Sequence, residues 1–343
     1  MSSFRDEIAE QPAVAERLLL QMESVQAIGA AIKAADPAGI VIAARGSSDN
    51  AAVYAKYVFQ LRNRLPVALA APSLFTHYAA PPRIARYCVL GISQSGAAPD
   101  VCAVVEEGRR QGAVTVALTN EPDSPLAAAA DFVISLQAGL ERSVPASKTY
   151  TASLVAIAML SQVIDPNEDF VGALLRIPDA MRGVERHEAE LRKMAPLIQG
   201  SRVIVLGRGF NLATSEELAL KLTETSYVLA RAWSAADFLH GPIAVTDPDF
   251  PIILVEALGP TYAETREVFS LLAKQGARIF QVGDGTRHLP VAAASVLLSS
   301  GLPESLTPLT LAVAGQLLAL HLAISRGLDP DRPRTLTKVT RTR

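Results

Sequence analysis

Apolar residues occur along the chain in short runs that end in polar turns and in longer stretches with helical spacing. The runs PVALA at 66–70, RYCVLGI at 86–92, AVTVALT at 113–119 and DFVISL at 131–136 have the length and composition of strands. Helical spacing covers residues 5–35 and the segments between several of these runs. Strands that alternate with helices predict an α/β fold with a parallel sheet.

Two of the apolar runs end in small polar turns. VIAA at 41–44 leads into RGSS at 45–48, and the strand at 86–92 leads into SQSG at 93–96, each before a helical pattern. The first N–H groups of a helix lack partners within the helix and lie at the positive end of its dipole, so such a turn can hold a phosphate without a lysine. A serine that only caps the helix accounts for the same residues. The turns alone leave both interpretations open.

The same order of patterns returns in the second half of the chain. Arg45-Gly46 aligns with Arg208-Gly209, and QGA at 111–113 aligns with QGA at 275–277 at nearly the same separation. These matches predict an internal duplication, in which each half is an open, doubly wound parallel sheet flanked by helices. The turn after the third strand reads SQSG in the first half and LGPT in the second, so we expect phosphate only in the first half.

The pattern divides the chain into five expected segments. They are an N-terminal helical segment (1–35), a first α/β domain with the phosphate turn (36–165), a helical connector rich in charged residues (166–200), a second α/β domain (201–330) and a C-terminal tail (331–343). A chain of 343 residues, half of them apolar, is long enough to bury the cores of two such domains.

Net charge, cysteine content and the apolar stretches limit the classes of protein to which the chain can belong. The net charge of −2 gives no support for a nucleic-acid partner. Cys88 and Cys102 lie in apolar segments, so we expect free core thiols in the cytoplasm rather than a disulfide. The acidic start MSSFRDEIAE lacks a signal-peptide pattern, and the apolar stretch 309–324 contains Gln316 and His321. We therefore expect that stretch to be a buried helix and no part of the chain to enter a membrane.

Seven short motifs, in order along nearly the whole chain, resemble the sugar isomerase (SIS) superfamily. They are EIAEQP (7–12), RGSSDN (45–50), ISQSG (92–96), ERSVPASKTY (141–150), EELALKLTETSY (216–227), HGP (240–242) and DRPRTLTKV (331–339). Within the superfamily the chain is similar to the isomerase part of glucosamine-6-phosphate synthase and to the related deaminases and deglycases. The resemblance implies two tandem SIS domains and a tail that folds over the active site.

The resemblance also implies which residues bind a sugar phosphate. They are Ser47, Ser48, Ser93, Gln94, Ser95, Val144 through its backbone, and Thr337. Within this set, residues 93–95 are implied to hold the phosphate, and Ser48 and Val144 to contact the sugar hydroxyls. A threonine of the family falls on Ala98, so we expect one phosphate hydrogen bond to be lost or to come from a neighbour such as Ser47.

Three catalytic residues follow from the same resemblance. Glu224 is implied to be the base that moves a proton between C1 and C2, and His240 to open the sugar ring from the neighbouring subunit of a homodimer. Lys338 is implied to meet the C2 carbonyl, in some members as a Schiff base. The neutral amine that this requires is favoured by a nearby cation, for which Arg332 and Arg334 are candidates.

Each of these residues also has an ordinary structural interpretation. Glu224 could form a helix-surface pair with Lys221, His240 could cap a helix or pack in a core, and Lys338 could be a solvated charge in a basic tail. The other histidines, at 77, 187, 288 and 321, have no spacing typical of metal ligands, so we expect no metal and no cofactor.

The implied chemistry interconverts an aldose 6-phosphate that carries a C2 amino group and a ketose 6-phosphate. The sequence begins MSSF, and too few residues precede the turn at 45–48 to form the glutaminase domain of the synthase. We therefore expect a deaminase that converts glucosamine 6-phosphate to fructose 6-phosphate and ammonia. A phosphosugar isomerase or a deglycase of a phosphorylated sugar–amino-acid adduct is the alternative, and a sugar-phosphate sensor without turnover is the second.

Overall fold

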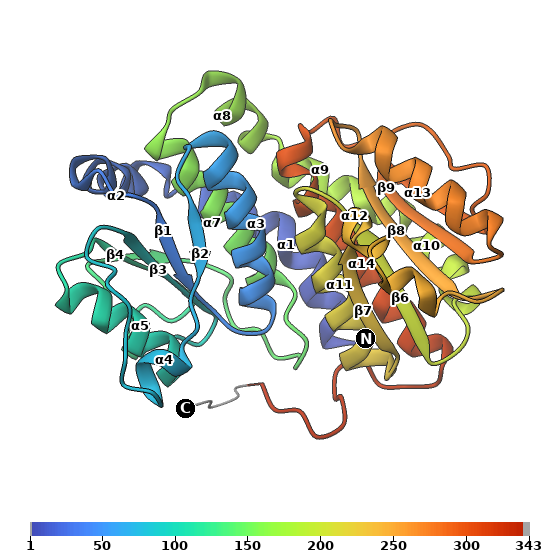
Figure 1. Cartoon of the computed structure of the whole chain (residues 1–343), viewed down its shortest axis with the longest axis horizontal. Helices are drawn as coiled ribbons and strands as arrows, with labels where there is room; N and C mark the ends of the chain where they lie inside the picture. The colour runs from blue at the N-terminus through green and yellow to red at the C-terminus, as the bar shows by residue number, and fades with distance from the viewer. Residues whose placement is uncertain (1, 339–343) are drawn as a thin grey trace. The chain divides into compact units, whose positions relative to one another are not determined.

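The computed structural model describes residues 2–338, which form two compact α/β units (Figure 1). The first unit comprises residues 13–141, 148–175 and 337–338, and the second unit comprises residues 2–12, 142–147 and 176–336. Each unit therefore gathers segments that are far apart in the sequence. The five segments expected from the sequence remain a prediction about domain boundaries.

The first unit is built on a parallel sheet with the strand order β2-β1-β3-β4-β5. Its strands are β1 (Ile40–Ala43), β2 (Val67–Leu69), β3 (Cys88–Ser93), β4 (Thr115–Thr119) and β5 (Phe132–Ser135). The strands predicted at 66–70, 86–92, 113–119 and 131–136 are confirmed as β2 to β5. After β2 the chain returns to the other side of β1, so the strand order reverses between β1 and β3.

Helices cover both faces of this sheet (Figure 1). They are α2 (Met22–Ala35), α3 (Ser47–Arg62), α4 (Ser73–Thr76), α5 (Pro99–Arg110), α6 (Pro125–Ala129), α7 (Lys148–Ile164) and α8 (Glu168–Leu175), while α1 (Ser3–Leu19) runs from the second unit into the first. Helices α2 and α3 pack against α7, and α5 packs on the opposite face against Val89 and Ala117. A Cβ at Gly29 would lie 2.7 Å from the Val163 side chain, so glycine lets α2 and α7 approach closely.

The second unit repeats the topology of the first. Its parallel strands are β6 (Arg202–Gly207), β7 (Leu229–Ser234), β8 (Pro251–Ala257), β9 (Arg278–Asp284) and β10 (Ala294–Leu298), in the order β10-β9-β8-β6-β7. In both sheets the first strand of the unit lies between the second and the third, and the fourth and fifth follow the third. The doubly wound α/β fold predicted for each half, and its repetition, are confirmed.

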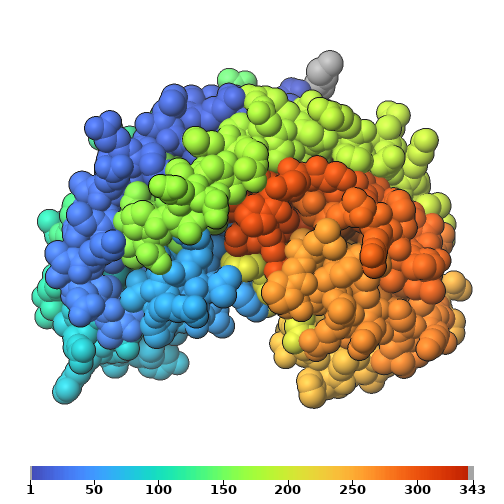
Figure 2. Space-filling model, turned by 90° about the horizontal axis from the view of Figure 1, so that it is seen from above, coloured from blue at the N-terminus to red at the C-terminus, as the bar shows by residue number. Residues whose placement is uncertain are grey.

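The helices of the second unit form two layers around its sheet. They are α9 (Ile177–Val184), α10 (Glu188–Met194), α11 (Asn211–Ser226), α12 (Ala235–Phe238), α13 (Tyr262–Lys274) and α14 (Thr307–Ser325), with 3₁₀ turns at Glu185–His187, Ala195–Leu197, Pro242–Val245 and Glu304–Leu306. Helix α14 packs against α9, α10 and α11. In Figure 2 the yellow-green segment of α9 and α10 lies beside the orange-red chain that leads into α14. Phe238 of α12 and Phe269 of α13 pack with Ile252 and Leu254 on the other face.

The most apolar helix of the second unit belongs to its core. Among the described residues, the segment Glu304–Ser325 alone is long and apolar enough to cross a membrane, but 89% of its apolar window is buried inside the protein. Nearly every side chain of α14 is covered by neighbouring elements, which explains why apolar residues occur all around it. The stretch 309–324 is therefore a buried helix, as expected.

The first turn of α1 is held by a residue from near the end of the chain. The Asp331 carboxylate accepts hydrogen bonds from the backbone N–H groups of Ser3 (2.9 Å) and Phe4 (2.8 Å), and from the Ser2 hydroxyl (2.6 Å). These N–H groups have no acceptor inside the helix, so Asp331 acts as a helix cap supplied from 327 positions or more away.

A second long-range contact fixes the same helix. The Arg5 guanidinium donates to both oxygens of Glu188, at 2.9 and 2.6 Å, and His321 Nε2 lies 3.1 Å from that carboxylate. Burial acts to raise the pKa of Glu188, but the hydrogen bonds from Arg5 and His321 outweigh it and lower this pKa. Burial lowers the pKa of His321, despite the opposing contact with Glu188.

Candidate functional site

The two polar turns of the first unit lie where its strand order reverses. Strands β1 and β3 are neighbours in register, with Ile40 opposite Cys88 and Ala43 opposite Gly91. Both strands therefore end at the same edge, and the turns at 45–48 and 93–96 leave the sheet side by side. Open α/β sheets bind ligands at this point, beyond the carboxyl ends of the strands. The geometry brings together the two turns that the sequence singled out.

The turn after β1 opens directly into α3. Gly46 has a φ of 56°, which favours glycine, and no other group lies within 4 Å of where its Cβ would be. Arg45 Nε donates to Asp100 at 2.7 Å, and the Asp100 side chain is 1% exposed. This ion pair links the turn to the first turn of α5. No local pattern in the sequence points to Arg45 or Asp100, because the contact joins positions 55 residues apart.

The turn after β3 uses its serines in a specific way. Ser93 Oγ accepts the Gly96 N–H at 3.1 Å, and Ser95 Oγ accepts the Ala97 N–H at 3.3 Å. A hydroxyl that accepts a backbone N–H still has its own hydrogen to donate. The turn thereby orients both hydroxyls while leaving two O–H donors for an anion. Gly96 has a φ of 58° and its Cβ would lie 2.0 Å from Ser124 Oγ, so the turn requires glycine there.

Gln94 and Ala98 complete this turn. The Gln94 carbonyl accepts the Asn120 N–H at 3.1 Å, which ties the turn to the end of β4, and the residue is half-buried. Ala98 is the N-cap residue of α5 and has no side chain that can cap the helix, and Pro99 follows it. The first turn of α5 therefore lacks the hydroxyl that a threonine at 98 would supply.

A carboxylate occupies the equivalent place in the second unit. A Cβ at Gly259, in the turn after β8, would lie 2.0 Å from Glu304 Oε2, and Glu304 Oε1 lies 3.4 Å from Thr261 Oγ1. Burial raises the pKa of Glu304, and the hydrogen bond from Thr261 opposes this effect. A carboxylate here disfavours a phosphate by repulsion between like charges. The expectation that only the first half holds phosphate stays a prediction.

The loop that carries Val144 is held by the motif near the start of the chain. The buried Glu7 carboxylate accepts hydrogen bonds from the Arg142 N–H, from the Ser143 N–H at 3.2 Å and from the Ser143 hydroxyl. Val144, the next residue, is half-buried. The EIAEQP motif thus fixes the backbone next to the predicted sugar contact, a role of Glu7 that no local pattern in the sequence indicates.

A second residue of that motif supports the far end of the loop. Gln11 Nε2 donates to Gln316 Oε1 at 2.8 Å, and Gln316 Nε2 donates to the Ser147 carbonyl at 3.4 Å. All three residues are buried. Gln316, which looked out of place in an apolar helix, therefore belongs to a polar connection between α1, α14 and the loop.

Glu224 lies on α11 beside a buried lysine. Lys221 Nζ is 2.6 Å from Glu224 Oε2 and 3.5 Å from Glu217 Oε1, and the Lys221 side chain is 1% exposed. The Glu224 side chain is 21% exposed. The pair is therefore not a surface pair of the ordinary i,i+3 kind, because its lysine is enclosed and its carboxylate is partly open. The role of Glu224 as a base stays a prediction.

His240 lies on an exposed turn of the second unit. It follows α12, its N–H donates to the Asp237 carbonyl at 3.0 Å, and Gly241 after it has a φ of 129°. The residue is exposed, so it is not a core histidine. Its role in ring opening from a neighbouring subunit stays a prediction.

Lys338 belongs to the first unit and pairs with a carboxylate of that unit. Lys338 Nζ lies 2.6 Å from Glu141 Oε2, and the side chains are 23% and 0% exposed. Lys338 is therefore not a solvated charge. The charged group in contact with its amine is the Glu141 carboxylate, whereas the candidate neighbours expected from the sequence were the cations Arg332 and Arg334. Thr337 beside it is exposed.

Arg334 is engaged elsewhere, in the second unit. Its backbone N–H donates to the Tyr227 hydroxyl at 2.9 Å, and its guanidinium carbon lies 4.4 Å from the centre of the Tyr227 ring. Tyr227 directly follows α11, three positions after Glu224, and has a φ of 52°. The end of the helix that carries the predicted base therefore anchors the tail that carries the predicted lysine.

The predicted site residues are divided between the units. Ser47, Ser48, Ser93, Gln94, Ser95, Thr337 and Lys338 belong to the first unit, and Val144, Glu224 and His240 belong to the second. Among the described residues, no three histidine, cysteine or carboxylate side chains are arranged to hold a metal ion. The roles of the predicted site residues in binding and catalysis stay predictions.

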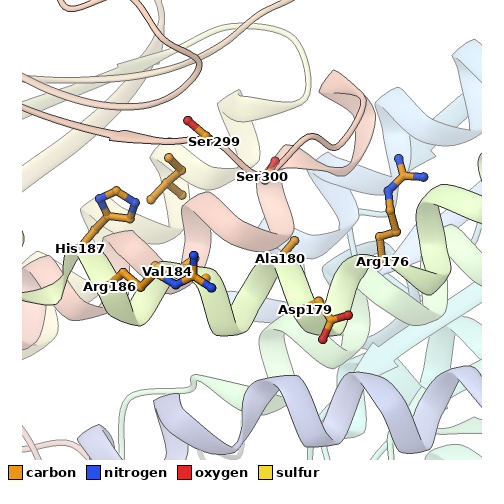
Figure 3. Close-up of a pocket in the computed structure, with 10 residues that line it drawn as sticks. Arg176, Asp179, Ala180, Val184, Arg186, His187, Ser299 and Ser300 are labelled. Atoms are coloured by element: carbon orange, nitrogen blue, oxygen red, sulfur yellow. The ribbon is translucent and has the colours of Figure 1, made fainter.

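A cavity of about 330 Å³ in the second unit contains none of these residues. In Figure 3, Ser299 and Ser300 lie on the loop after β10 and face the helical segment that carries Arg176 and His187, while Asp179 points away from that loop. Asp179 instead forms an ion pair with Arg182 at 2.6 Å.

Comparisons with known proteins agree with this architecture. A model of the SIS domain matches residues 35–162 and 196–326. Glutamine–fructose-6-phosphate aminotransferase (isomerizing) of Bradyrhizobium diazoefficiens is 33% identical over 311 residues, which cover 87% of this chain and 51% of that protein. The protein of the same name from Gloeobacter violaceus is 33% identical over 320 residues, or 89% and 52% of the two chains. The chain thus spans about half the length of these relatives.

Solved structures show the same fold over nearly the whole chain. A protein named as a candidate phosphosugar isomerase from Silicibacter pomeroyi DSS-3 is 34% identical, with a TM-score of 0.89 over 96% of this chain and 100% of that one. The C-terminal domain of glucosamine-fructose-6-phosphate aminotransferase from Francisella tularensis has a TM-score of 0.88 at 24% identity over 96% and 98% of the chains. Glucosamine-6-phosphate deaminase from Thermotoga maritima has a TM-score of 0.77 at 19% identity, over 99% and 98%, a likeness of fold alone.

Both matched regions coincide with the two repeated sheets, and together they cover most of the chain. The sequence motifs, the repeated strand order and the family model lead to one conclusion. The chain belongs to the SIS domain family.

Proposed function

We propose that this protein is an enzyme that isomerises an amino-sugar 6-phosphate and releases its amine, converting glucosamine 6-phosphate to fructose 6-phosphate and ammonia. The observation that carries the proposal is the pair of oriented hydroxyls at Ser93 and Ser95. They lie at the point of strand reversal with O–H groups available to an anion. Relatives named for phosphosugar isomerisation and for fructose 6-phosphate share this architecture.

Phosphate binding in this proposal needs no cationic side chain. The Ser93 and Ser95 hydroxyls and the Gln94 amide donate to the phosphate, and the N-terminus of α5 adds the positive end of its dipole. Ser47 and Ser48, at the start of α3, approach from the neighbouring turn. The backbone of Val144 and the hydroxyl of Thr337 contact the sugar.

Proton transfer is assigned to Glu224. After the ring opens with the help of His240, the carboxylate takes the proton from C2 and delivers it to C1, while one proton of the amine passes to O1. The C1 aldehyde thereby becomes an alcohol and the C2 amine becomes an imine. Water then adds to the imine, the C–N bond breaks, and the products are the C2 ketone and ammonia. Lys221, enclosed beside Glu224, holds the carboxylate in place. Lys338 is the residue assigned to contact the C2 carbonyl of the sugar.

The two thiols of the chain are unsuited to release ammonia from glutamine. Burial raises the pKa of Cys88 to about 12, and burial with the nearby carboxylates raises the pKa of Cys102 to about 11. Neither is a thiolate at neutral pH, so neither is suited to attack the amide of glutamine. We propose the cytoplasm as the compartment, since both thiols are free, and a homodimer in which His240 acts in the partner's site.

The test compares Glu224→Gln with Glu216→Gln, a substitution on the same helix outside the proposed site. We expect Glu224→Gln to lower ammonia release from glucosamine 6-phosphate, and proton exchange at C2 in deuterated water, by about 10²–10⁴-fold. Binding of the sugar phosphate should survive, because glutamine keeps the shape of the side chain. Glu216→Gln should retain wild-type turnover.

Other results of these assays would point to the alternative functions. Release of an amino acid from a phosphorylated sugar–amino-acid adduct, without ammonia from glucosamine 6-phosphate, would make the protein a deglycase. Ketose formation from an unsubstituted aldose phosphate alone would make it an isomerase. Wild-type protein that binds the sugar phosphate yet shows neither exchange nor product would be a sensor, and the enzyme proposal would be wrong.

A further inference from the structure

The contact between Glu141 and Lys338 has an unusual environment for an ion pair near the end of a chain. The Glu141 side chain is 0% exposed, and Lys338 reaches it at 2.6 Å while keeping 23% of its own side chain exposed. Exposed ion pairs contribute little to stability, because water screens them and both side chains lose freedom. A fully buried carboxylate is different, since its charge requires partners in the folded protein.

The carboxylate is oriented by the start of α7. Glu141 Oε1 accepts the Thr149 N–H at 3.1 Å, and Oε2 accepts the Thr149 hydroxyl at 2.8 Å. Both oxygens are thus fixed by one residue in the first turn of the helix, where the dipole also favours a negative charge. Oε2 carries the contact with Lys338, so the lysine meets a rigid acceptor.

This geometry has a consequence for a lysine that must act as a nucleophile. An ammonium has no lone pair, so it cannot attack a carbonyl until it loses a proton. The group in contact with Lys338 Nζ is the Glu141 carboxylate, at the distance of a strong charge-assisted hydrogen bond. Proton transfer between heavy atoms requires this kind of contact, of about 2.6–3.2 Å.

We propose that Glu141 is the proton acceptor that converts Lys338 to its neutral, nucleophilic form. The inference rests on the proposed function, because the product of that reaction, fructose 6-phosphate, gives Lys338 a C2 carbonyl to attack. Glu141 then has two functions, which are to hold the ammonium in the absence of sugar and to take its proton when sugar is bound.

The step balances without any further reactant. The Lys338 ammonium gives one proton to the Glu141 carboxylate, and the freed electron pair of Nζ forms a bond to C2 while the C=O electron pair moves to oxygen. A proton passes from nitrogen to that oxygen, which gives a hydroxyl. Glu141 then returns its proton to the hydroxyl as the C–O bond breaks, so that water leaves and a C2 iminium on Lys338 remains.

Two measurements on Glu141→Gln test the proposal, and they should change in opposite directions. The first is reductive trapping of the Lys338 adduct with fructose 6-phosphate and borohydride, read by mass spectrometry of the Lys338 peptide. Glutamine cannot accept the proton, so trapping should fall by about 10²-fold. The second is labelling of Lys338 by acetic anhydride without sugar. It should be several-fold faster, because the ammonium loses its anionic partner.

The controls separate this role from a structural one. Glu106→Gln removes an exposed carboxylate of the same unit and should change neither measurement. Glu141→Asp keeps the carboxylate on a shorter side chain and should recover part of the trapping. Thermal melting of each variant shows whether the first unit is folded. A merely structural Glu141 would give Gln and Asp variants that lose trapping equally.

Trapping within two-fold of wild type in Glu141→Gln would overturn the proposal, and so would slower labelling in that variant. The measurements also distinguish a failure of this inference from a failure of the proposed function. Wild-type protein that releases ammonia from glucosamine 6-phosphate but yields no trapped adduct overturns the inference alone. Wild-type protein that gives neither product nor adduct overturns the proposed function together with it.

Discussion

Replacing Glu7 by alanine should destabilise the second unit strongly, although Glu7 lies near the start of the chain and outside the predicted catalytic set. Its buried carboxylate accepts hydrogen bonds from the Arg142 N–H, the Ser143 N–H and the Ser143 hydroxyl. Alanine leaves these donors facing a space without an acceptor. A buried donor that loses its partner costs about 1–3 kcal/mol.

The expected total is about 3–5 kcal/mol, since water entering the space will satisfy some of the donors. Folded domains are stable by only about 5–15 kcal/mol, so this is a large fraction. For a unit of roughly 150–250 residues, each kcal/mol lowers the melting temperature by about 2–4 °C. The melting transition of the second unit should therefore fall by roughly 6–20 °C.

Differential scanning calorimetry of the full chain measures this shift, with Glu10→Gln as the matched control. Glu10 is exposed on the same helix, and substitutions at such positions change stability by no more than about 0.5 kcal/mol. The apparent KM for glucosamine 6-phosphate should also rise in Glu7→Ala, because the loop that carries Val144 loses its support. A melting temperature within 2 °C of wild type in Glu7→Ala would show that the carboxylate does not hold the loop.

Three further predictions follow from other contacts. Gly96→Ala should raise the KM for the sugar phosphate at least ten-fold in steady-state assays, because φ is 58° and the new Cβ would lie 2.0 Å from Ser124 Oγ; an unchanged KM would remove this turn from the site. Tyr227→Phe keeps the ring but loses the hydroxyl that accepts the Arg334 N–H, so turnover should fall several-fold while the melting temperature drops by only the equivalent of about 1 kcal/mol. Because burial lowers the pKa of His321, the unfolded chain binds its proton more readily, and stability should fall as the pH drops through 6.5. Melting curves at pH 7.5 and 5.5 should show this loss, and His321→Gln should reduce it; an equal loss in the variant would contradict the assignment.

Local patterns in the sequence predicted most of the fold. The apolar runs predicted strands β2 to β5, and two short matches between the halves of the sequence predicted the duplication. Both predictions were possible because strand periodicity and turn chemistry are properties of neighbouring residues. The position of the two polar turns also followed from the sequence, since parallel strands end at one edge of a sheet. The turn residues 45–48 and 93–96 lie there as expected.

The contacts that the sequence did not predict join positions far apart in the chain. Glu7 reaches residues 142 and 143, Arg45 reaches Asp100, and Glu141 reaches Lys338. No spacing rule connects such positions, because their proximity depends on how helices pack on a sheet. The position of Glu304 beside Gly259, in the turn after β8, was not predicted for the same reason.

The capping of α1 by Asp331 has a consequence for synthesis on the ribosome. At about 5–20 residues per second, the cap emerges roughly 20–60 s after the helix that it completes. The segments 13–141 and 148–175 contain every strand of the first unit, so that sheet can form while translation continues. The second unit cannot complete its fold until residue 331 has been synthesised, because its first and last segments meet at Ser3, Phe4 and Asp331. A nascent chain halted before residue 331 would therefore present a folded first unit and an α1 start that remains uncapped.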